Sequence, residues 1–419
     1  MEDDGLNRNL TRMEIAVEGV SDILLDELTP IEVVCGESIL TPGLQTSIKL
    51  HTHKFTTYEG RGDIKNFDEF RGRIMTINLN KPSLKDFGIK SEMTISHPIY
   101  RMDKRKLYNN NTDEFYLHLT HKTLLEDAVS LMTKLWKCKT PSQVVEDVLR
   151  GCIGASLVDI EPSNYLRDYE ANNIHPYQVI AQQANAALHA GNDSPSFLHY
   201  MTYEIGSGDG IHHFESLDRM VAREPLFSGN NHPRGGKFYF SEIEGVDSFG
   251  DPFGMITHSF PCDFDLLTDL MNGSNKGQTI GSYVGVNQVL GTTSHFGQNL
   301  DFCNKGVTVP KAGLSNWATA KRQNMCPDYA HLFAQKRQAR MALIEQDKIA
   351  LRMTVPWNPE LHAGRTIYLE LLNKLRPELT IYGNGKYLIH SLTHNIKQGG
   401  YATTTIDCVS QSVGTTATV

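Results

Sequence analysis

The sequence predicts a mainly β protein with helical insertions, in the α+β class. Short runs that alternate apolar and polar residues fill the first third of the chain and return near its C-terminal end. Between these two β units, segments with helical spacing follow prolines that favour a first helical turn. The length of 419 residues is enough for roughly two to four domains with sizeable cores.

The first β unit consists of runs separated by turn-forming proline and glycine. In order they read MEIAV, IEVVCG, LQTSIKLHTH, GRIMTINLN, EMTISHPIY and EFYLHLTH. Regular spacing of this kind indicates a barrel or a sandwich, so we assign a first β-barrel domain to residues 1–130. The basic segment RMDKRKLYNNN, residues 101–111, is explained by a solvated hairpin tip, with phosphate contact as the alternative.

Helices are predicted in the next part of the chain. Thr140 and Gln143 form a capping-box pair around Pro141, and apolar residues follow at helical spacing. This helix should end at Gly151 or Gly154. A second helix is predicted from residue 176, followed by a strand pair, PSFLHYMTYE and GIHHFESLDRMV, around the turn GSGDG. We assign residues 131–230 to a domain of helices plus a β-hairpin.

The remaining chain divides into an irregular segment and a second β unit. Residues 231–327 are rich in Gly, Asn, Ser and aromatic residues, and we assign them to an irregular β insertion. A helix over about residues 328–350 and a second β-barrel domain complete the range 328–419. Its end, GKYLIHSLTHNIKQGGYATTTIDCVSQSV, reads as two strands joined at Gly399-Gly400. LTPGLQTSIKLH and LHAGRTIYLELL share a Leu-x-x-Gly step before a β-rich run, which suggests a duplicated barrel.

Composition excludes several classes of protein. The chain has 40 Lys and Arg against 48 Asp and Glu, a net charge of −8, which argues against a protein that coats nucleic acid. Seven scattered cysteines without a close pair indicate neither a disulfide framework nor a zinc knuckle. The start lacks the pattern of a signal peptide, and no apolar run approaches the roughly 18 residues of a membrane span. We therefore expect a soluble protein in a reducing compartment.

Sequence motifs of catalysis are absent. The chain has no GxxxxGK[ST], GxGxxG, HExxH, GxSxG or EF-hand pattern. His51 and His53 share a strand face, but no third ligand for a metal ion is identifiable. His212 and His213 are adjacent on a strand and point to opposite faces.

The C-terminal hairpin poses the same question about a metal site. His390 and His394 are four residues apart on one strand, about 13 Å between their Cα atoms. A shared ion needs ligand atoms about 2 Å from its centre, so these histidines are expected to be structural. No catalytic, cofactor-binding or metal-binding residue is assigned, no cofactor is expected, and nothing in the sequence supports an enzyme.

The segment NIHPYQVIAQQANAAL…SPSFLHYMTYEIGSGDGIHHFESLDRMV, residues 173–221, resembles the central baseplate hub proteins of contractile-tailed, T-even-like phages. That family has a "PF..I..L...A" helix before a "SFLFYE…DGY.F.SLDSL" hairpin. The passages DFDLLTDLMNGSNKGQTIG and QKRQARMALIEQDKIALRMTVPWNPELHAGRTIYLEL are also similar to the family, as is the C-terminal hairpin. "VPWN" and "AGR" replace the usual "VPGN" and "AGD". Residues 1–135 agree only in β-character.

The resemblance implies a structural virion protein. Each chain would contribute two similar, tail-tube-like β-barrels to a homotrimeric ring, so that three chains match the sixfold tail tube and the threefold spike. The implied partners are the chain itself, the trimeric central spike protein, the tail tube or its initiator, baseplate wedge proteins, the tape measure protein, and DNA in transit through the bore during ejection. The implied location is the tail baseplate of the virion, assembled in the host cytoplasm.

Two other functions stay open at this stage. A tail-associated cell-wall hydrolase would need clustered carboxylates or a Cys/His site in a cleft. The hub of a related contractile injection system would share the fold, and a fused needle would distinguish it from a phage hub.

Overall fold

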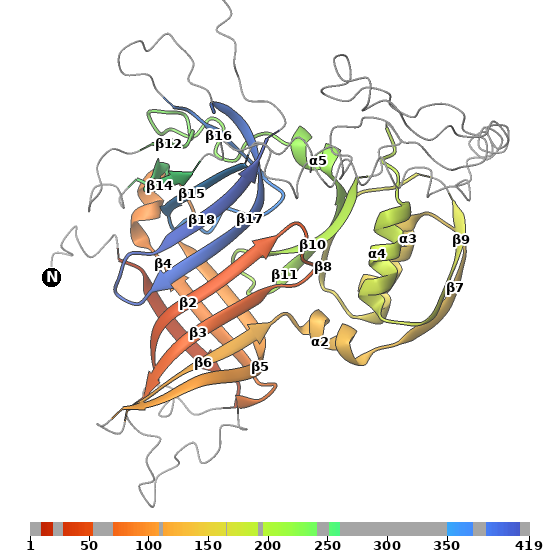
Figure 1. The fold of residues 1–419 in the computed structure, drawn as a ribbon, viewed down its shortest axis with the longest axis horizontal. Coiled ribbons are helices and arrows are strands. Elements are labelled where there is room, and N and C mark those ends of the chain that lie inside the picture. The colour runs from red at the N-terminus through yellow and green to blue at the C-terminus, as the bar shows by residue number, and fades with distance from the viewer. Residues whose placement is uncertain are drawn as a thin grey trace, which may run out of the picture.

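The computed structural model describes residues 10–19, 28–52, 70–108, 112–164, 166–191, 196–240, 251–259, 350–371 and 383–410. Within these ranges no helix has the length and apolar character to cross a membrane. Figure 1 shows two parts, a strongly curved sheet and a smaller insertion that contains most of the helices.

The N-terminal β unit forms one half of the curved sheet. Its strands are β1 (Arg12–Val17), β2 (Leu28–Ser38), β3 (Gln45–Thr52), β4 (Ile74–Asn80), β5 (Glu92–Tyr108) and β6 (Thr112–Thr120), with a 3₁₀ turn at Pro82–Phe87. They are ordered β1-β4-β5-β6-β3-β2, and every pair is antiparallel. β5 pairs with β4 along its first half and with β6 along its second, so one bent strand turns the sheet around the core.

The C-terminal unit continues the same sheet. It contains β14 (Thr257–Ser259), β15 (Ala350–Pro356), β16 (Thr366–Leu369), β17 (Gly385–Lys397) and β18 (Thr403–Val409). The order continues β2-β17-β18-β15-β14, and β16 pairs with the first part of β17. A short parallel pair, β12 (Tyr239–Phe240) and β13 (Gly254–Met255), lies beside it.

The junction between the two units is the antiparallel pair β2–β17. Its register runs from Ser38 opposite Ser391 to Glu32 opposite Lys397. One hydrophobic cluster continues beneath both units and includes Ile48 and Leu117 of the first and Met353 and Ile406 of the second. The mainly β class with helices is confirmed. The two β units expected as separate barrels are joined in the described chain into one sheet of eleven strands over one core.

The insertion follows β6 and has a core of its own. Its elements are α2 (Lys122–Val129), β7 (Met132–Lys139), α3 (Pro141–Glu146), a π-helical turn (Asp147–Cys152), β8 (Leu157–Ile160), β9 (Arg167–Ile174), α4 (Pro176–Ala186), β10 (Phe197–Tyr203), β11 (Gly210–Ser216) and α5 (Leu217–Ala222). In Figure 1, α3 and α4 lie between the β7–β9 ribbon and the β10–β11 hairpin. The side chains of Val144, Val148 and Ile180 are completely buried there.

Most elements expected in the insertion are present. Thr140 and Gln143 form the predicted capping box of α3, and the helical segment ends at Cys152, just before Gly154 with its φ of +64°. The hairpin is present, but the strand predicted to run through GIHHFESLDRMV ends at Ser216, whose hydroxyl caps α5. The helix expected over residues 328–350 lies outside the described residues. The residue limits of the four expected domains stay predictions.

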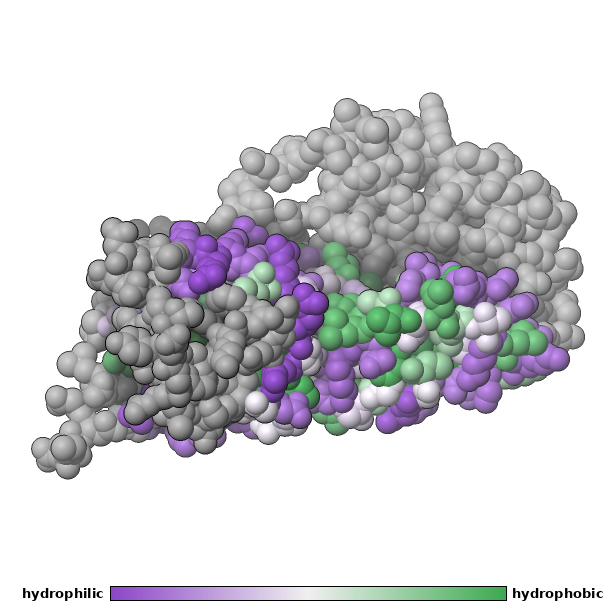
Figure 2. Space-filling model, turned by 90° about the horizontal axis from the view of Figure 1, so that it is seen from below, coloured by the Kyte–Doolittle hydropathy of each residue, from purple (hydrophilic) through white to green (hydrophobic). Residues whose placement is uncertain are grey.

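The lower end of the insertion exposes apolar side chains. Val129 is 80% exposed, Leu131 56% and Leu135 52%. Figure 2, seen from below, shows hydrophobic residues gathered over the region of α2 and β7. The described part of the chain therefore leaves this end of the insertion uncovered.

Candidate functional site: the outer face of the continuous sheet

The outer face of the continuous sheet is the largest regular surface of the described chain. Inward residues of each strand are buried in the common core, and outward residues alternate with them. Figure 1 shows β2, β3, β6, β17 and β18 side by side, with no described element in front of them. This outer face of β18, β17, β2, β3 and β6 is called the outer sheet face below.

Short uncharged side chains occupy the middle of the outer sheet face. Thr354, Thr405 and Thr393 lie opposite one another on successive strands, and Gly36 follows in the same row. The Thr354 and Thr405 hydroxyl oxygens are 3.4 Å apart. Such cross-strand threonine pairs stabilise a sheet without adding charge. The centre of the face is thus polar and neutral.

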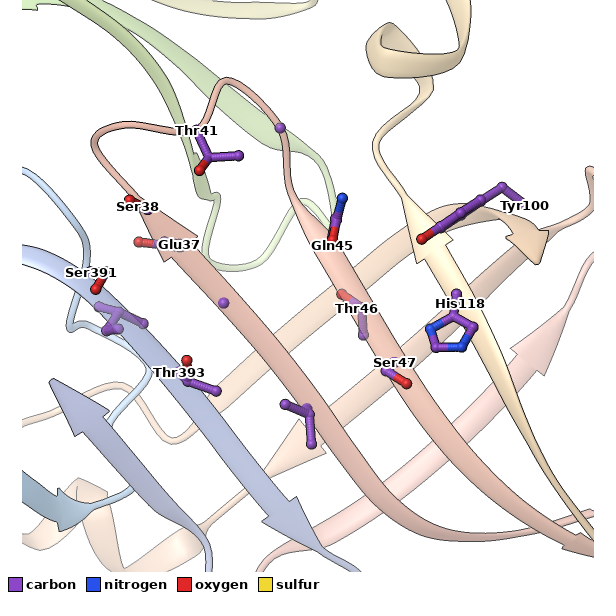
Figure 3. A pocket seen from close by; sticks show the side chains of 14 residues that line it. Glu37, Ser38, Thr41, Gln45, Thr46, Ser47, Tyr100, His118, Ser391 and Thr393 are labelled. Carbon is purple, nitrogen blue, oxygen red and sulfur yellow. The ribbon is translucent and has the colours of Figure 1, made fainter. Parts of the chain in front are cut away.

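A shallow hollow of about 420 Å³ lies on this face between β17, β2 and β3. Figure 3 shows side chains with hydroxyl and amide groups around it, including Ser38, Gln45 and Thr393. Gly36 forms its floor, where a Cβ atom would lie 3.2 Å from the carbonyl oxygen of Leu392. Hydroxyls in an open hollow can hold water or touch a passing molecule, but they lack the enclosure that binds a small ligand tightly.

The titratable groups near this hollow are already paired. His118 Nε2 lies 3.0 Å from Asp103 Oδ1, and this hydrogen bond lowers the pKa of Asp103 below its usual value. Glu37 points away from the outer sheet face and its side chain is completely buried. The arrangement therefore offers no activated nucleophile or free general base among the described residues that line the hollow.

Glu37 joins three parts of the molecule. Its carboxylate accepts hydrogen bonds from the backbone N–H of Tyr203 in the insertion at 2.8 Å and of Ala363 in the C-terminal unit at 2.8 Å. The Nδ1 atom of His362 lies 3.0 Å from the same carboxylate. A buried carboxylate with three partners fixes these segments relative to β2. The sequence contained a signal for this role, because Glu37 occupies an inward position of an alternating strand.

A row of histidines lies where the insertion meets the N-terminal unit. His121, at the end of β6, is 2.5 Å from the carboxylate of Asp209, and its other ring nitrogen is 2.7 Å from the Thr123 hydroxyl. His212 lies 3.1 Å from that hydroxyl, and the rings of His97 and His121 stack edge to face. Burial lowers the pKa of His97 to about 3 and that of His212 well below its usual value. The His97 and His212 rings are therefore neutral parts of the junction.

The histidines singled out in the sequence are distributed over several sites. His51 lies on β3, whereas His53 is outside the described residues. His212 is buried among the junction histidines, and His213 lies on the opposite face, stacked on Tyr200 with ring centroids 4.8 Å apart.

In the C-terminal hairpin, His394 is buried and its Nδ1 lies 2.9 Å from the Thr404 hydroxyl. His390 falls at a register shift between Ile389 and Ser391. Among the described ranges no group of three or more His, Cys, Asp or Glu is placed to hold a metal ion.

Solved structures share this fold over almost the whole chain. The tail protein from Neisseria meningitidis MC58 matches with a TM-score of 0.52 and 10% identity, covering 96% of this chain and 97% of that one. The 43 kDa tail protein of prophage MuSo2 from Shewanella oneidensis matches with a TM-score of 0.54 and 8% identity, covering 95% and 98%. This chain shares the fold of these tail proteins. No protein-family model and no curated protein sequence matches it.

Proposed function

We propose that this chain is a structural component of a contractile tail, the central hub of its baseplate. The observation that carries the proposal is the continuous eleven-stranded sheet, whose two β units lie on one core and leave uncovered a face with an uncharged middle row. The likeness in fold to two tail proteins along nearly the entire chain supports it. Three copies would place six β units around a bore, with the outer sheet face turned inward.

The chemistry of the outer sheet face suits a bore for DNA. Lysine and arginine side chains bind phosphates strongly and would slow a passing duplex. The threonine row and Gly36 present hydroxyls and backbone in the middle of the face. Lys49 and Arg352 beside this row are paired with Glu114 and Asp407, and the whole chain has a net charge of −8. The partners of such a hub would be two further copies, a trimeric spike, the tail tube or its initiator, baseplate wedge proteins and the tape measure protein, with location in the virion after assembly in the host cytoplasm.

The decisive measurement is the mass of the particle in solution, alone and mixed with the adjacent spike protein. We expect three times the 47.0 kDa mass of one chain and a larger complex with the spike. Light scattering coupled to gel filtration measures both masses. A chain that stays monomeric at high concentration and does not bind the spike protein would contradict the proposal of a hub.

A matched pair of variants tests the inward orientation of the outer sheet face. Thr393→Lys places a charge on this face, and Asn172→Lys places the same charge on an exposed position of β9 in the insertion. In the assembled ring, only Thr393→Lys should increase retention of short duplex DNA, in a salt-dependent way. Equal retention by the two variants would place the face outside the bore.

The hub of a related injection system is the second candidate, because such a protein would use the same ring. A zymogram on peptidoglycan separates both hubs from a tail-associated hydrolase. We expect no lytic zone, and a zone that survives purification of the trimer would favour the hydrolase.

A further inference from the structure

A second cavity, of about 290 Å³, lies where the insertion meets the C-terminal unit. Its walls come from the β10–β11 hairpin, from β8, from Arg223 just after α5, and from residues 362–365 between β15 and β16. The charged residues that line it are Lys90, Asp159, Glu204, Arg223 and Arg365. None of these residues belongs to the outer sheet face.

Nearly all the buried charges around this cavity are paired. The Glu215 carboxylate is completely buried and receives two hydrogen bonds from the Arg223 guanidinium, at 2.6 and 2.9 Å. Asp159 accepts from Arg219 at 3.0 Å and lies 3.4 Å from His213 Nδ1. These contacts, with that of His213 first, hold the pKa of Asp159 well below its usual range. Among the residues of this network, the Nη1 atom of Arg219 is buried without an acceptor.

Of the two arginines in the described cavity wall, only Arg365 lacks a partner, and the side chains of Lys90 and Glu204 are likewise unpaired within the described chain. The Arg365 side chain makes no hydrogen bond and no ion pair within the described chain, and its Nε atom is buried without an acceptor. Burial, and then the like charge of Arg223, lower its pKa. The Nε–H group of Arg365 has lost water without gaining an acceptor, which is costly, so its placement favours an anionic partner.

We propose that this cavity binds a carboxylate group, with the Arg365 guanidinium as its main donor. Arginine recognises carboxylates through two parallel N–H···O bonds. Three cationic and two anionic side chains line the cavity, which leaves one positive charge for a monovalent anion. A phosphate dianion would hold both of its charges beside Asp159 and Glu204, whereas a carboxylate group brings one charge to Arg365, and the second carboxylate of a dicarboxylate can stay in solvent.

The size of the cavity defines the class of ligand further. About 290 Å³ is at the lower limit of small-molecule sites, which suits a short dicarboxylate or one acidic side chain of a neighbouring chain. Tyr200 and Ala363 supply apolar surface for the methylene groups of such a ligand. All these residues belong to one chain, so the site does not depend on the proposed ring.

Titration calorimetry on the full-length protein tests the site with defined probes. Sodium glutarate and a capped Gly-Glu-Gly peptide carry the carboxylate, and glutaramide and the capped Gly-Gln-Gly peptide are their uncharged counterparts. We expect the carboxylates to bind with Kd values on the order of 1 mM and the amides to bind at least about tenfold more weakly. If both glutarate and the peptide bind, the cavity accepts small carboxylates in general. If only the peptide binds, the natural ligand is an acidic side chain of a partner protein.

Variants attribute the binding to Arg365. Arg365→Met should weaken glutarate binding at least about tenfold, because the bidentate donor is lost. Arg150→Met, at an exposed arginine of the π-helical turn that pairs with Glu146, should leave binding unchanged. No heat from any carboxylate up to about 50 mM, or equal binding by Arg365→Met, would overturn the proposal.

Thermal unfolding without ligand separates a binding role from a structural one. Because Arg365 has no partner in the described chain, Arg365→Met should keep or raise the midpoint of unfolding. Arg223→Met removes the bidentate donor of the buried Glu215 carboxylate, which keeps only the Tyr200 hydroxyl and the more distant Arg219 guanidinium, and should lower the midpoint clearly. If Arg365→Met lowers the midpoint as far as Arg223→Met does, the guanidinium is part of the structural network and the proposed site fails.

Discussion

Replacement of Glu37 by alanine should weaken the joint between the three parts of the molecule more than any surface substitution does. The carboxylate is completely buried and accepts from two backbone N–H groups and from His362. Alanine leaves both backbone donors buried without an acceptor. It also opens a void between β2 and the insertion.

The magnitude follows from the three contacts. A hydrogen bond to a charged acceptor contributes about 1.5–3 kcal/mol, and an unsatisfied buried donor costs about 1–3 kcal/mol. Since neighbouring contacts are not additive, we expect Glu37→Ala to lower the free energy of unfolding by about 4 kcal/mol. Glu37→Gln keeps one acceptor oxygen but turns an N–H donor toward one of its partners, so about 2 kcal/mol is expected.

Urea unfolding followed by circular dichroism measures the stability, and hydrogen exchange read by mass spectrometry locates the change. The amides of Tyr203 and Ala363 should exchange faster in Glu37→Ala, because they lose their acceptor. Glu92→Ala is the control, since that carboxylate is 66% exposed in its ion pair.

The reasoning is refuted if Glu37→Ala costs less than about 1 kcal/mol and leaves the exchange of both amides unchanged. That outcome would mean that the insertion is held by its apolar contacts alone. A variant that lowers stability but spares both amides would point to the void rather than to the lost hydrogen bonds.

Three further outcomes are expected. Burial lowers the pKa of His97 to about 3 and that of His394 to about 4. Because the unfolded chain takes up these protons below its pKa of about 6.5 and the folded chain does not, the free energy of unfolding should fall as the pH drops below 6.5 toward those values. Each of the two histidines should lower the free energy of unfolding by up to about 2 kcal/mol near pH 5. His97→Phe should therefore reduce the loss of stability that urea unfolding measures at several pH values. Gly364→Ala should lower the melting temperature strongly, because its φ is +76° and the new Cβ would lie 2.1 Å from a tyrosine hydroxyl; Gly399→Ala, with φ +59° and no atom within 4 Å, should cost only about 1 kcal/mol. Thr393→Lys should change the free energy of unfolding by less than about 0.5 kcal/mol, since this side chain is exposed.

Local patterns in the sequence were sufficient for the elements that local forces determine. The capping box at Thr140 and Gln143 and the alternation in the β10–β11 hairpin identify α3 and that hairpin before any tertiary contact is considered. The strand β17 was also predicted, but the register shift within it was not. A register shift at Ile389 and Ser391 breaks the alternation, so Tyr387 and Ile389 are buried together with Leu392.

Local sequence patterns could not predict contacts between segments that are distant in the chain. Nothing in the runs IEVVCG and IHSLTHNIK indicates that β2 pairs with β17, since both strands alternate and either could pair elsewhere. The same holds for the junction of His121 with Asp209, 88 residues apart in the chain. The unpartnered guanidinium of Arg365 becomes visible only when its surroundings are known, because its own sequence neighbours give it no special pattern.

Several carboxylates of the described chain connect segments that are distant in the sequence. Glu37 joins β2 to the segments at Tyr203 and Ala363, and Asp209 joins the insertion to the end of β6. Glu215 is enclosed by Arg223. Each of these carboxylates holds two parts of the chain together, and the side chains of Glu37 and Glu215 are completely buried. In the proposed hub, joints of this kind would hold the large sheet and the insertion in fixed positions.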